Sequence, residues 1–298
     1  MNAFFDLEGR LRLHWRFVIV MAGLFAIQIA VGIVLGIALV VASIVTGGSA
    51  TAAVPAPWRA WAELVAFVPS ALLLIALVCA CRRWLDRRPI RSLGLERPRW
   101  SVLLAFALGL AAGVLPAAVL IAAGGYRFTG VSASLQTAFL APVLAVMAFE
   151  EEILCRGYLQ QNLIDAGRPA AALIVSTLVF WLLHAFNPGM WSSPLPSLNL
   201  VVVGVLLALA YRVAGNIWLP TALHYAWNLA QGIVLQLPVS GLRFDGVFDL
   251  ESTGRLPSWL TGGTFGLESS VLTTAATAPV AVAFALVLKR RSRTPADV

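Results

Sequence analysis

Long apolar stretches alternate with short polar segments along the whole chain. A transmembrane helix needs about 20 predominantly apolar residues, so each long stretch predicts a membrane-spanning helix. Eight such stretches lie at about residues 17–45, 61–81, 102–123, 135–161, 170–185, 198–211, 217–237 and 271–288. The sequence contains neither an internal repeat nor a segment with the composition of a soluble domain. The pattern therefore predicts an all-α, polytopic membrane protein with about eight transmembrane helices.

Composition agrees with this fold class and excludes others. Of the 298 residues, 60% are hydrophobic and only 12% are charged, with a mean hydropathy of +0.87, a balance that no soluble domain needs. The net charge of +7 does not indicate nucleic acid, because the basic residues stand in short clusters between apolar stretches. The predicted partner is therefore the lipid bilayer. Cys79, Cys81 and Cys155 lie in or beside apolar stretches and predict no disulfide.

The basic clusters predict how the chain crosses the membrane. Eight spans put both termini on one side, together with the N-terminal arginines, the arginine-rich segment 82–99 and the basic cluster 289–293. Positive residues favour the cytoplasmic side, so both termini are expected in the cytoplasm of a cell-membrane protein. The predicted parts are a basic lead at 1–16, a membrane domain at 17–288 with its core at 135–237, and a basic tail at 289–298.

Three carboxylates and a guanidinium interrupt the fourth stretch, in the octet Phe149–Arg156. An acidic side chain at a helix centre costs about 2.5–3.5 kcal/mol in lipid, so at least some of these groups must face protein or water. Glu152 and Arg156 stand four residues apart, in the order that favours an intrahelical ion pair. Glu151 projects about 100° away and stays free for chemistry, while Glu150 points to another face. Taken alone, the octet fits a solvated acidic helix end at the membrane surface equally well.

Two histidines on later stretches change that balance. Helices rise about 1.5 Å per residue, so Glu151 and His184 are expected at one height, roughly 22–24 Å above the turn that joins their helices. His224 comes within a turn or two of that height. It shares a helix face with Asn228, four residues further on, as His184 does with Phe180. A single histidine in a span is usually a packed core residue, whereas two histidines level with a glutamate indicate a site.

Three motifs carry a resemblance to a known family: Glu151-Glu152-x-x-x-Arg156, Phe180-x-x-x-His184 and His224-x-x-x-Asn228. In this order, and spread over separate spans, they resemble the CAAX-protease and bacteriocin-processing (CPBP, Abi) intramembrane endopeptidases. Relatives of these enzymes include the type II CAAX prenyl endopeptidases. The resemblance covers about residues 142–235, and the stretch from Gly262 to Glu268 also looks like one that bacterial members carry before their last span.

The resemblance implies a division of roles among these residues. Glu151 would be the general base that activates a water, and His184, His224 and Asn228 would bind a metal or polarise the scissile carbonyl and its oxyanion. Peptide hydrolysis needs such a base, an electrophile for the developing oxyanion, and water held in a dry cavity. The chemistry of these residue types therefore agrees with the roles that the family implies.

The expected cofactor is a divalent metal, zinc. Glu151, His184 and His224 can supply three ligands and leave the fourth position for water, as in catalytic zinc sites. A metal-free alternative stays open, with Glu151 as base and the two histidines and Asn228 as hydrogen-bond donors. The sequence lacks the paired i, i+4 histidines of common zinc proteases, and Asn228 is a poor zinc ligand but a good oxyanion donor.

The sequence therefore predicts an intramembrane metalloendopeptidase whose site opens towards the cytoplasm. Its expected substrate is a lipidated or otherwise membrane-associated protein or peptide, cut near the C-terminus. The alternative is a non-proteolytic, proton-coupled transporter or membrane scaffold that uses the same Glu/His cluster as a proton relay. Transporters commonly contain internal repeats, and none is visible in this sequence, which favours the enzyme.

Overall fold

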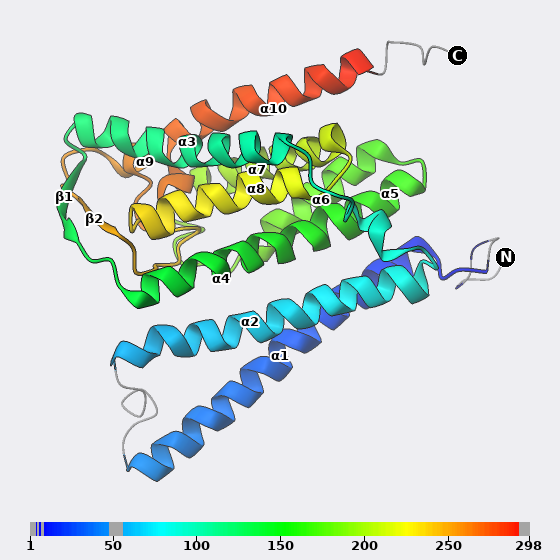
Figure 1. Ribbon diagram of the computed structural model, residues 1–298, viewed down its shortest axis with the longest axis horizontal. Coiled ribbons are helices and arrows are strands. Elements are labelled where there is room, and N and C mark those ends of the chain that lie inside the picture. The colour runs from blue at the N-terminus through cyan, green and yellow to red at the C-terminus, as the bar shows by residue number, and fades with distance from the viewer. Residues whose placement is uncertain (1–3, 5, 7–8, 48–55, 292–298) are drawn as a thin grey trace. The chain divides into compact units, whose positions relative to one another are not determined.

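The computed structural model describes residues 4, 6, 9–47 and 56–291, with residues 46 and 56–66 described by their backbone alone. Parts of the predicted basic lead and residues 292–298 of the predicted basic tail lie outside this range. The chain divides into two compact units at Ile90 (Figure 1). The first unit contains the two N-terminal helices, and the second contains every predicted site residue.

Two long helices make up the first unit. α1 (Leu13–Thr46) packs against α2 (Ala56–Ala80), which continues into the π-helical turn η1 (Cys81–Leu85). The fully buried Asp86 carboxylate lies 3.5 Å from an Arg16 nitrogen and 3.3 Å from an Arg82 nitrogen. This pairing holds the start of α1 beside the end of α2 and neutralises part of two basic clusters.

The second unit is a bundle of helices with a small two-stranded sheet at one end (Figure 1). Its helices are α3 (Ser101–Ala122), α4 (Leu135–Glu152), α5 (Gln161–Asp165), α6 (Pro169–Leu183), α7 (Pro194–Ala214), α8 (Trp218–Asn228), α9 (Ser258–Thr261) and α10 (Val271–Arg291). The shorter helical segments are η2 (Ile90–Leu93), η3 (Ile153–Gln160), η4 (Leu229–Val234) and η5 (Leu267–Ser269), of which η3 and η4 are π-helical. α4, η3 and α5 follow one another without a break, as do α8 and η4.

Local sequence signals explain where several helices begin and end. α4 starts at a capping box, in which the Thr137 N–H donates to the Ser134 hydroxyl at 3.2 Å and the Ser134 N–H donates to the Thr137 hydroxyl at 3.3 Å. A proline begins α6 and α7, at a position where no backbone N–H is needed. α7 ends at Gly215, whose φ of 69° is a left-handed conformation that favours glycine.

The core lies between α6, α7 and α8, with α3 and α10 packed around it. α3 approaches α8 through small residues. A Cβ added at Gly109 would lie 2.4 Å from the Leu223 carbonyl oxygen, and one added at Gly113 would lie 2.7 Å from the Ala230 Cβ. Glycine at these two positions permits the close approach that small residues give to membrane helices. The contact positions the helix that carries His224.

The all-α prediction misses one feature, a pair of short β-strands in an otherwise helical fold. β1 (Tyr126–Val131) pairs antiparallel with β2 (Phe248–Ser252), where the sequence pattern predicts loops. Arg127 and Glu251 form an exposed ion pair across the two strands, with 2.8 Å between nitrogen and oxygen. These partners are 124 residues apart in the sequence, so no local sequence pattern predicts that the two strands pair.

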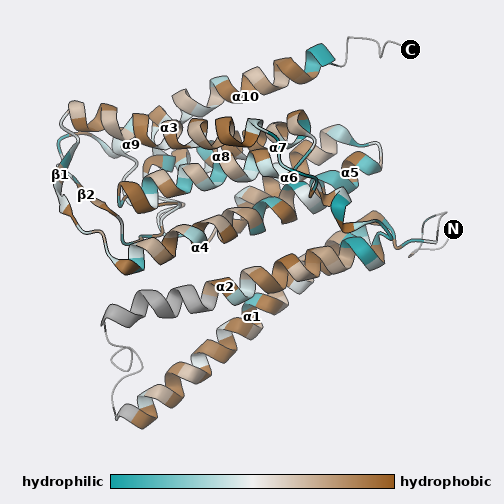
Figure 2. Ribbon diagram, in the orientation of Figure 1, coloured by the Kyte–Doolittle hydropathy of each residue, from teal (hydrophilic) through white to brown (hydrophobic). Residues whose placement is uncertain are grey.

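Helices occupy all eight predicted positions in the described chain, and five of them are long and apolar enough to cross a membrane. The five are Leu13–Val45, Phe67–Leu85, Ser101–Ala122, Pro194–Ala214 and Val271–Arg291. Figure 2 shows that apolar residues cover most of these helices, while the last turn of α10 is hydrophilic. α6 is apolar but has only 15 residues, and α4 and α8 carry the polar residues of the site. The fold is therefore that of a membrane protein, and the count of eight spans stays a prediction.

Basic side chains gather at one end of the second unit. Arg99, Arg212 and Arg291 line a surface hollow beside the ends of α7 and α10, where an Arg291 nitrogen donates to the Val213 carbonyl at 2.7 Å. The sheet lies at the opposite end (Figure 1). This separation is what the positive-inside rule expects of a cytoplasmic and an outer end, and the orientation itself stays a prediction.

The contact between α3 and α8 predicts the effect of Gly109→Ala. The added methyl group meets a backbone carbonyl that cannot move alone, so the substitution should destabilise the protein by about 1–3 kcal/mol. Gly32→Ala on α1 is the matched control, because an added Cβ there meets nothing within 4 Å. The unfolding midpoint of the purified protein in detergent measures both, and equal midpoints would contradict the packing described.

The distribution of basic residues predicts the membrane orientation. In a background with the three cysteines replaced, Arg97→Cys should react with a membrane-impermeant thiol reagent only from the cytoplasmic side. Glu251→Cys, which is exposed on β2, should react only from outside. Labelling of both cysteines from one side of intact cells would refute the orientation.

Candidate active site

The acidic octet lies where α4 passes into the π-helical segment η3. Its three carboxylates have different surroundings: Glu150 is buried, the Glu152 side chain is 0% exposed, and the Glu151 side chain is 21% exposed. Insertion of π-helical turns into an α-helix is frequent at functional sites. Of the three acids, Glu151 is therefore the one within reach of solvent or a substrate.

Glu152 forms the ion pair that the sequence predicts. Its Oε1 atom lies 2.8 Å from an Arg156 Nη atom, and both side chains are fully buried. The other Nη atom of Arg156 donates to the Gly204 carbonyl on α7 at 3.1 Å. The pair therefore connects the acidic helix with a neighbour almost fifty residues further along the chain.

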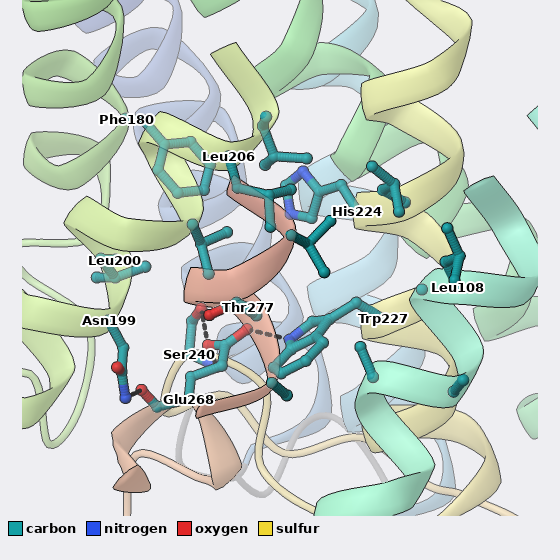
Figure 3. Close-up of a pocket in the computed structure, with 18 of the residues that line it drawn as sticks. Leu108, Phe180, Asn199, Leu200, Leu206, His224, Trp227, Ser240, Glu268 and Thr277 are labelled. Carbon is teal, nitrogen blue, oxygen red and sulfur yellow. Dashed lines mark hydrogen bonds between the residues drawn. The ribbon is translucent and has the colours of Figure 1, made fainter. Parts of the chain in front are cut away.

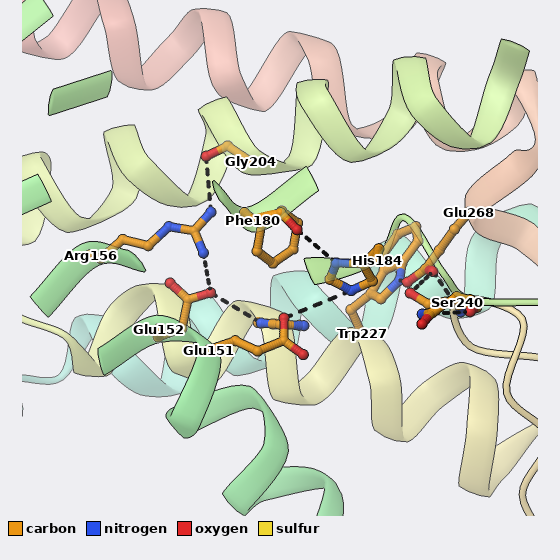
Figure 4. A network of polar contacts seen from close by, with 11 residues as sticks. Glu151, Glu152, Arg156, Phe180, His184, Gly204, Trp227, Ser240 and Glu268 are labelled. Atoms are coloured by element: carbon orange, nitrogen blue, oxygen red, sulfur yellow. Dashed lines mark hydrogen bonds and ion pairs between the residues drawn. The ribbon is translucent and has the colours of Figure 1, made fainter. Parts of the chain in front are cut away.

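Phe180 on α6 lies at the centre of the site (Figure 4). The Arg156 guanidinium carbon stands 4.5 Å from the centre of its ring, which is a cation–π contact. The imidazoles of His184 and His224 lie 4.8 and 5.8 Å from the same ring centre. The buried arginine and the two histidines therefore all pack against one fully buried aromatic side chain.

His184 ends α6 and faces Glu151. Its Nδ1 atom lies 2.8 Å from the Phe180 carbonyl oxygen, and its Nε2 atom lies 3.8 Å from the Glu151 Oε2 atom. A carbonyl oxygen can only accept, so Nδ1 must carry a proton, and the neutral ring then has its lone pair on Nε2. The side of the ring that can act on a water or a metal is therefore the side towards Glu151.

His224 on α8 is held by the buried ion pair. Its Nδ1 atom lies 3.1 Å from Glu152 Oε1, the same oxygen that binds Arg156. The carboxylate accepts a hydrogen bond from the Nδ1–H group, so in this ring too Nε2 is the nitrogen that the contact leaves available. The sequence predicts the pairing of Glu152 with Arg156 but gives no sign of this second contact.

Polar residues continue along the helix beyond His224. Asn228 and Gln231 follow it at positions four and seven residues further on, so all three share one face. The Asn228 Oδ1 atom is buried without a hydrogen-bond partner among the described residues, and so are both polar atoms of the Gln231 side chain. A buried polar group without a hydrogen-bond partner costs about 1–3 kcal/mol, so such groups are rare in folded proteins. Several of them beside His224 indicate a functional site. Gln231 was not among the predicted site residues, although it stands three residues after Asn228 in the sequence.

A cavity of about 260 Å³ adjoins the two histidines. Most of its lining is apolar and comes from α3, α6, α7, α8 and α10. Figure 3 shows Phe180 and His224 on one side of this cavity, Asn199 and Glu268 on the other, and Trp227 beside Glu268. The cavity is a mainly apolar space bordered by both histidines, and Glu151 is not among the residues that line it.

A second polar cluster at this cavity was not predicted as part of the site. The buried Glu268 carboxylate accepts from the Trp227 Nε1–H at 2.9 Å and from the Ser240 N–H at 2.7 Å. The stretch that ends at Glu268 is part of the family resemblance in the sequence, but no role could be predicted for it. The Glu268 backbone carbonyl also accepts from the Asn199 side chain at 2.8 Å. The three partners are 28 to 69 residues away in the sequence, so only the folded chain brings them together.

The three expected zinc ligands meet only in part. Glu151 and His184 face each other at 3.8 Å, whereas His224 is bonded to Glu152. Within the described part of the chain, no three His, Cys, Asp or Glu side chains gather closely enough to hold a metal ion. The donor set has the chemistry of a zinc site, but its geometry as it stands does not fit one.

Comparison with known proteins identifies a family that is similar to the central segment of the chain. No curated protein and no solved structure matches the sequence. Residues 133–230, about a third of the chain, match the family model described as type II CAAX prenyl endopeptidase Rce1-like. The match includes all three motifs and ends well before Glu268. It confirms the resemblance to the CAAX proteases, and this segment of the chain is accordingly similar to the Rce1-like type II CAAX prenyl endopeptidases.

Proposed function

We propose that the protein is an intramembrane endopeptidase in which Glu151 activates a water for attack on a peptide bond. The observation that carries this proposal is the separation of 3.8 Å between Glu151 Oε2 and His184 Nε2. This distance is too long for a hydrogen bond, and a water between the two atoms can bond to both. Glu152 cannot take the same role, because it is bound to Arg156 and His224.

The proposed reaction needs no group other than a water and the side chains of the site. The water oxygen attacks the carbonyl carbon of the scissile bond while Glu151 takes one of the water's protons. The C–N bond of the tetrahedral intermediate then breaks, and Glu151 returns the proton to the leaving nitrogen. The products are a carboxylic acid and an amine, and Glu151 is again a carboxylate.

The negative oxygen of the intermediate needs donors close by. The Glu152 carboxylate stabilises positive charge on the His224 ring through Nδ1, so a proton on Nε2 can be donated to that oxygen. The Asn228 side-chain amide stands one turn away on the same helix face. Glu152 and Arg156 act through these groups: they hold the histidine and keep its charge balanced.

The substrate we propose is a lipidated or otherwise membrane-associated protein or peptide, cut near its C-terminus. The apolar cavity beside the histidines and the apolar helices around it support a substrate that arrives within the membrane. The name of the matching family, type II CAAX prenyl endopeptidase, refers to prenylated substrates. The family match also weighs against the alternative of a proton-coupled transporter or scaffold. We further propose that the site opens towards the cytoplasm, where both termini are expected.

Zinc bound by Glu151, His184 and His224 is a separate proposal. It is supported by the donor chemistry and by the anchoring of both rings through Nδ1, which leaves each Nε2 atom available. Binding would require the third donor to move closer, because the three groups do not gather in the described structure.

Replacement of neighbouring glutamates separates the two roles. Glu151→Gln should lower kcat by about 100- to 10,000-fold, because an amide cannot take the proton of the water, and should leave the protein folded. Glu152→Gln should also lower the unfolding free energy, by about 3–5 kcal/mol, because it leaves a buried arginine without its charge partner. Cleavage of a farnesylated peptide and of its unmodified counterpart measures activity, and an unfolding curve in detergent measures stability.

The matched control is Glu251→Gln, an exposed glutamate in the same unit, which should change neither quantity. Full activity in folded Glu151→Gln protein would end the assignment of Glu151 as the base. Unchanged stability in Glu152→Gln would show that the buried pair contributes little.

Elemental analysis tests the zinc proposal without any activity measurement. The purified parent should contain about one divalent metal ion per chain, and both His184→Ala and His224→Ala should lose it. An active parent that contains no metal and is insensitive to chelators would leave the reaction to Glu151 and the hydrogen-bond donors alone.

A further inference from the structure

Glu268 is a buried carboxylate in the wall of the cavity, outside the residues matched by the family model and without a role in the proposed reaction. It accepts three hydrogen bonds, from the Trp227 Nε1–H at 2.9 Å, the Ser240 N–H at 2.7 Å and the Ser240 hydroxyl at 2.5 Å. All three donors are uncharged, and they approach both carboxylate oxygens. An amide could not replace this group, because only one of its two terminal atoms accepts.

The contacts of Glu268 lead towards both histidines. Trp227 lies three residues after His224 on α8, so the two side chains share a side of the helix and line one cavity (Figure 3). The Ser240 carbonyl accepts from Asn187 Nδ2 at 3.0 Å. The Asn187 N–H donates in turn to the His184 carbonyl, also at 3.0 Å. One carboxylate is therefore connected to the segments that carry both histidines.

The glycine-rich turn before Glu268 determines where the carboxylate points. Gly266 has a φ of 96°, and a Cβ there would lie 2.0 Å from the Pro238 carbonyl oxygen. The Gly241 N–H donates to the Phe265 carbonyl at 2.9 Å, so the turn packs on the loop that contains Ser240. On its other side, the Asn199 side chain of α7 donates to the Glu268 carbonyl at 2.8 Å. Glycine is required here because no side chain fits between the two backbones.

We propose that Glu268 is a positioning residue of the active site. By binding Trp227 and Ser240 it holds α8 together with the loop after η4, and Ser240 in turn binds Asn187 in the loop after α6. These contacts hold His224 and His184 in the relation that places them around the scissile bond (Figure 4). The inference rests on the proposed function and adds a residue from outside the three motifs. A displacement of about 1 Å in a catalytic group can cost about 100-fold in rate, so a carboxylate remote from the chemistry can matter for it.

Glu268→Gln and Trp227→Phe test the proposal together. In Glu268→Gln, at least one donor faces the new NH₂ group, so kcat should fall by about 10- to 100-fold while KM changes less than about threefold. Trp227→Phe removes the indole donor from the same contact, so the double variant should be no more than about twofold slower than Glu268→Gln. Glu251→Gln is the control and should retain the parent kcat.

A spectroscopic measurement makes the test independent of turnover. The chain has three histidines, so the imidazole ¹⁵N signals of His184 and His224 can be assigned with single variants. Both signals should shift in Glu268→Gln and stay in place in Glu251→Gln. If the parent does not cleave peptides, the proposed function fails, and these signals alone decide the role of Glu268. Unchanged ring signals in folded Glu268→Gln overturn it, and so does a loss of kcat that only follows the loss of folded protein.

Discussion

The second unit depends on one buried ion pair, between Glu152 and Arg156. Neither charge can be removed alone, because a single buried charge without its partner costs several kcal/mol. The pair also crosses the bundle, since Arg156 reaches the Gly204 carbonyl on α7 and the Phe180 ring on α6. Glu152 reaches His224 on α8. The contacts that compensate two buried charges are therefore also the contacts that orient the candidate site, so in the proposed function stability and activity depend on the same atoms.

Two adjacent glutamates have different surroundings because a helix turns by about 100° per residue. That rotation buries Glu152 among three helices and leaves Glu151 partly exposed beside His184. Both histidine rings are bonded through Nδ1 to an acceptor, a carbonyl for His184 and a carboxylate for His224. The two acceptors differ in charge, because the carbonyl that binds His184 is neutral and the carboxylate that binds His224 is negative. This asymmetry favours His184 as the partner of the water and His224 as the ring that carries positive charge opposite the oxyanion.

Local patterns in the sequence were sufficient for the helix positions, for the Glu152–Arg156 pair and for the common height of Glu151 and His184. Each of these rests on helix geometry within one segment or one hairpin. The pairing of β1 with β2, the bond from His224 to Glu152 and the contacts of Glu268 lie beyond such reasoning. They join residues 28 to 124 positions apart and depend on loop conformations, such as the left-handed Gly266, that no periodicity encodes. The number of membrane spans is harder to predict from the sequence, because helices that carry the site need not be apolar over their whole length when neighbouring helices cover them.

The cavity matters for both histidines and for Glu268, because electrostatic interactions at the edge of a mainly apolar space are stronger than in water. Glu268 lies across it from His224, and its hydrogen bonds come from neutral groups only (Figure 3). A lysine or arginine there would form a stronger bond to Glu268, but in the proposed reaction it would add a positive charge near the attacking water and would compete for the Glu151 carboxylate. Neutral donors hold the loops without this competition. Arg156 lies against the Phe180 ring and pairs with Glu152, so its positive charge does not compete for Glu151, the base of the proposed reaction.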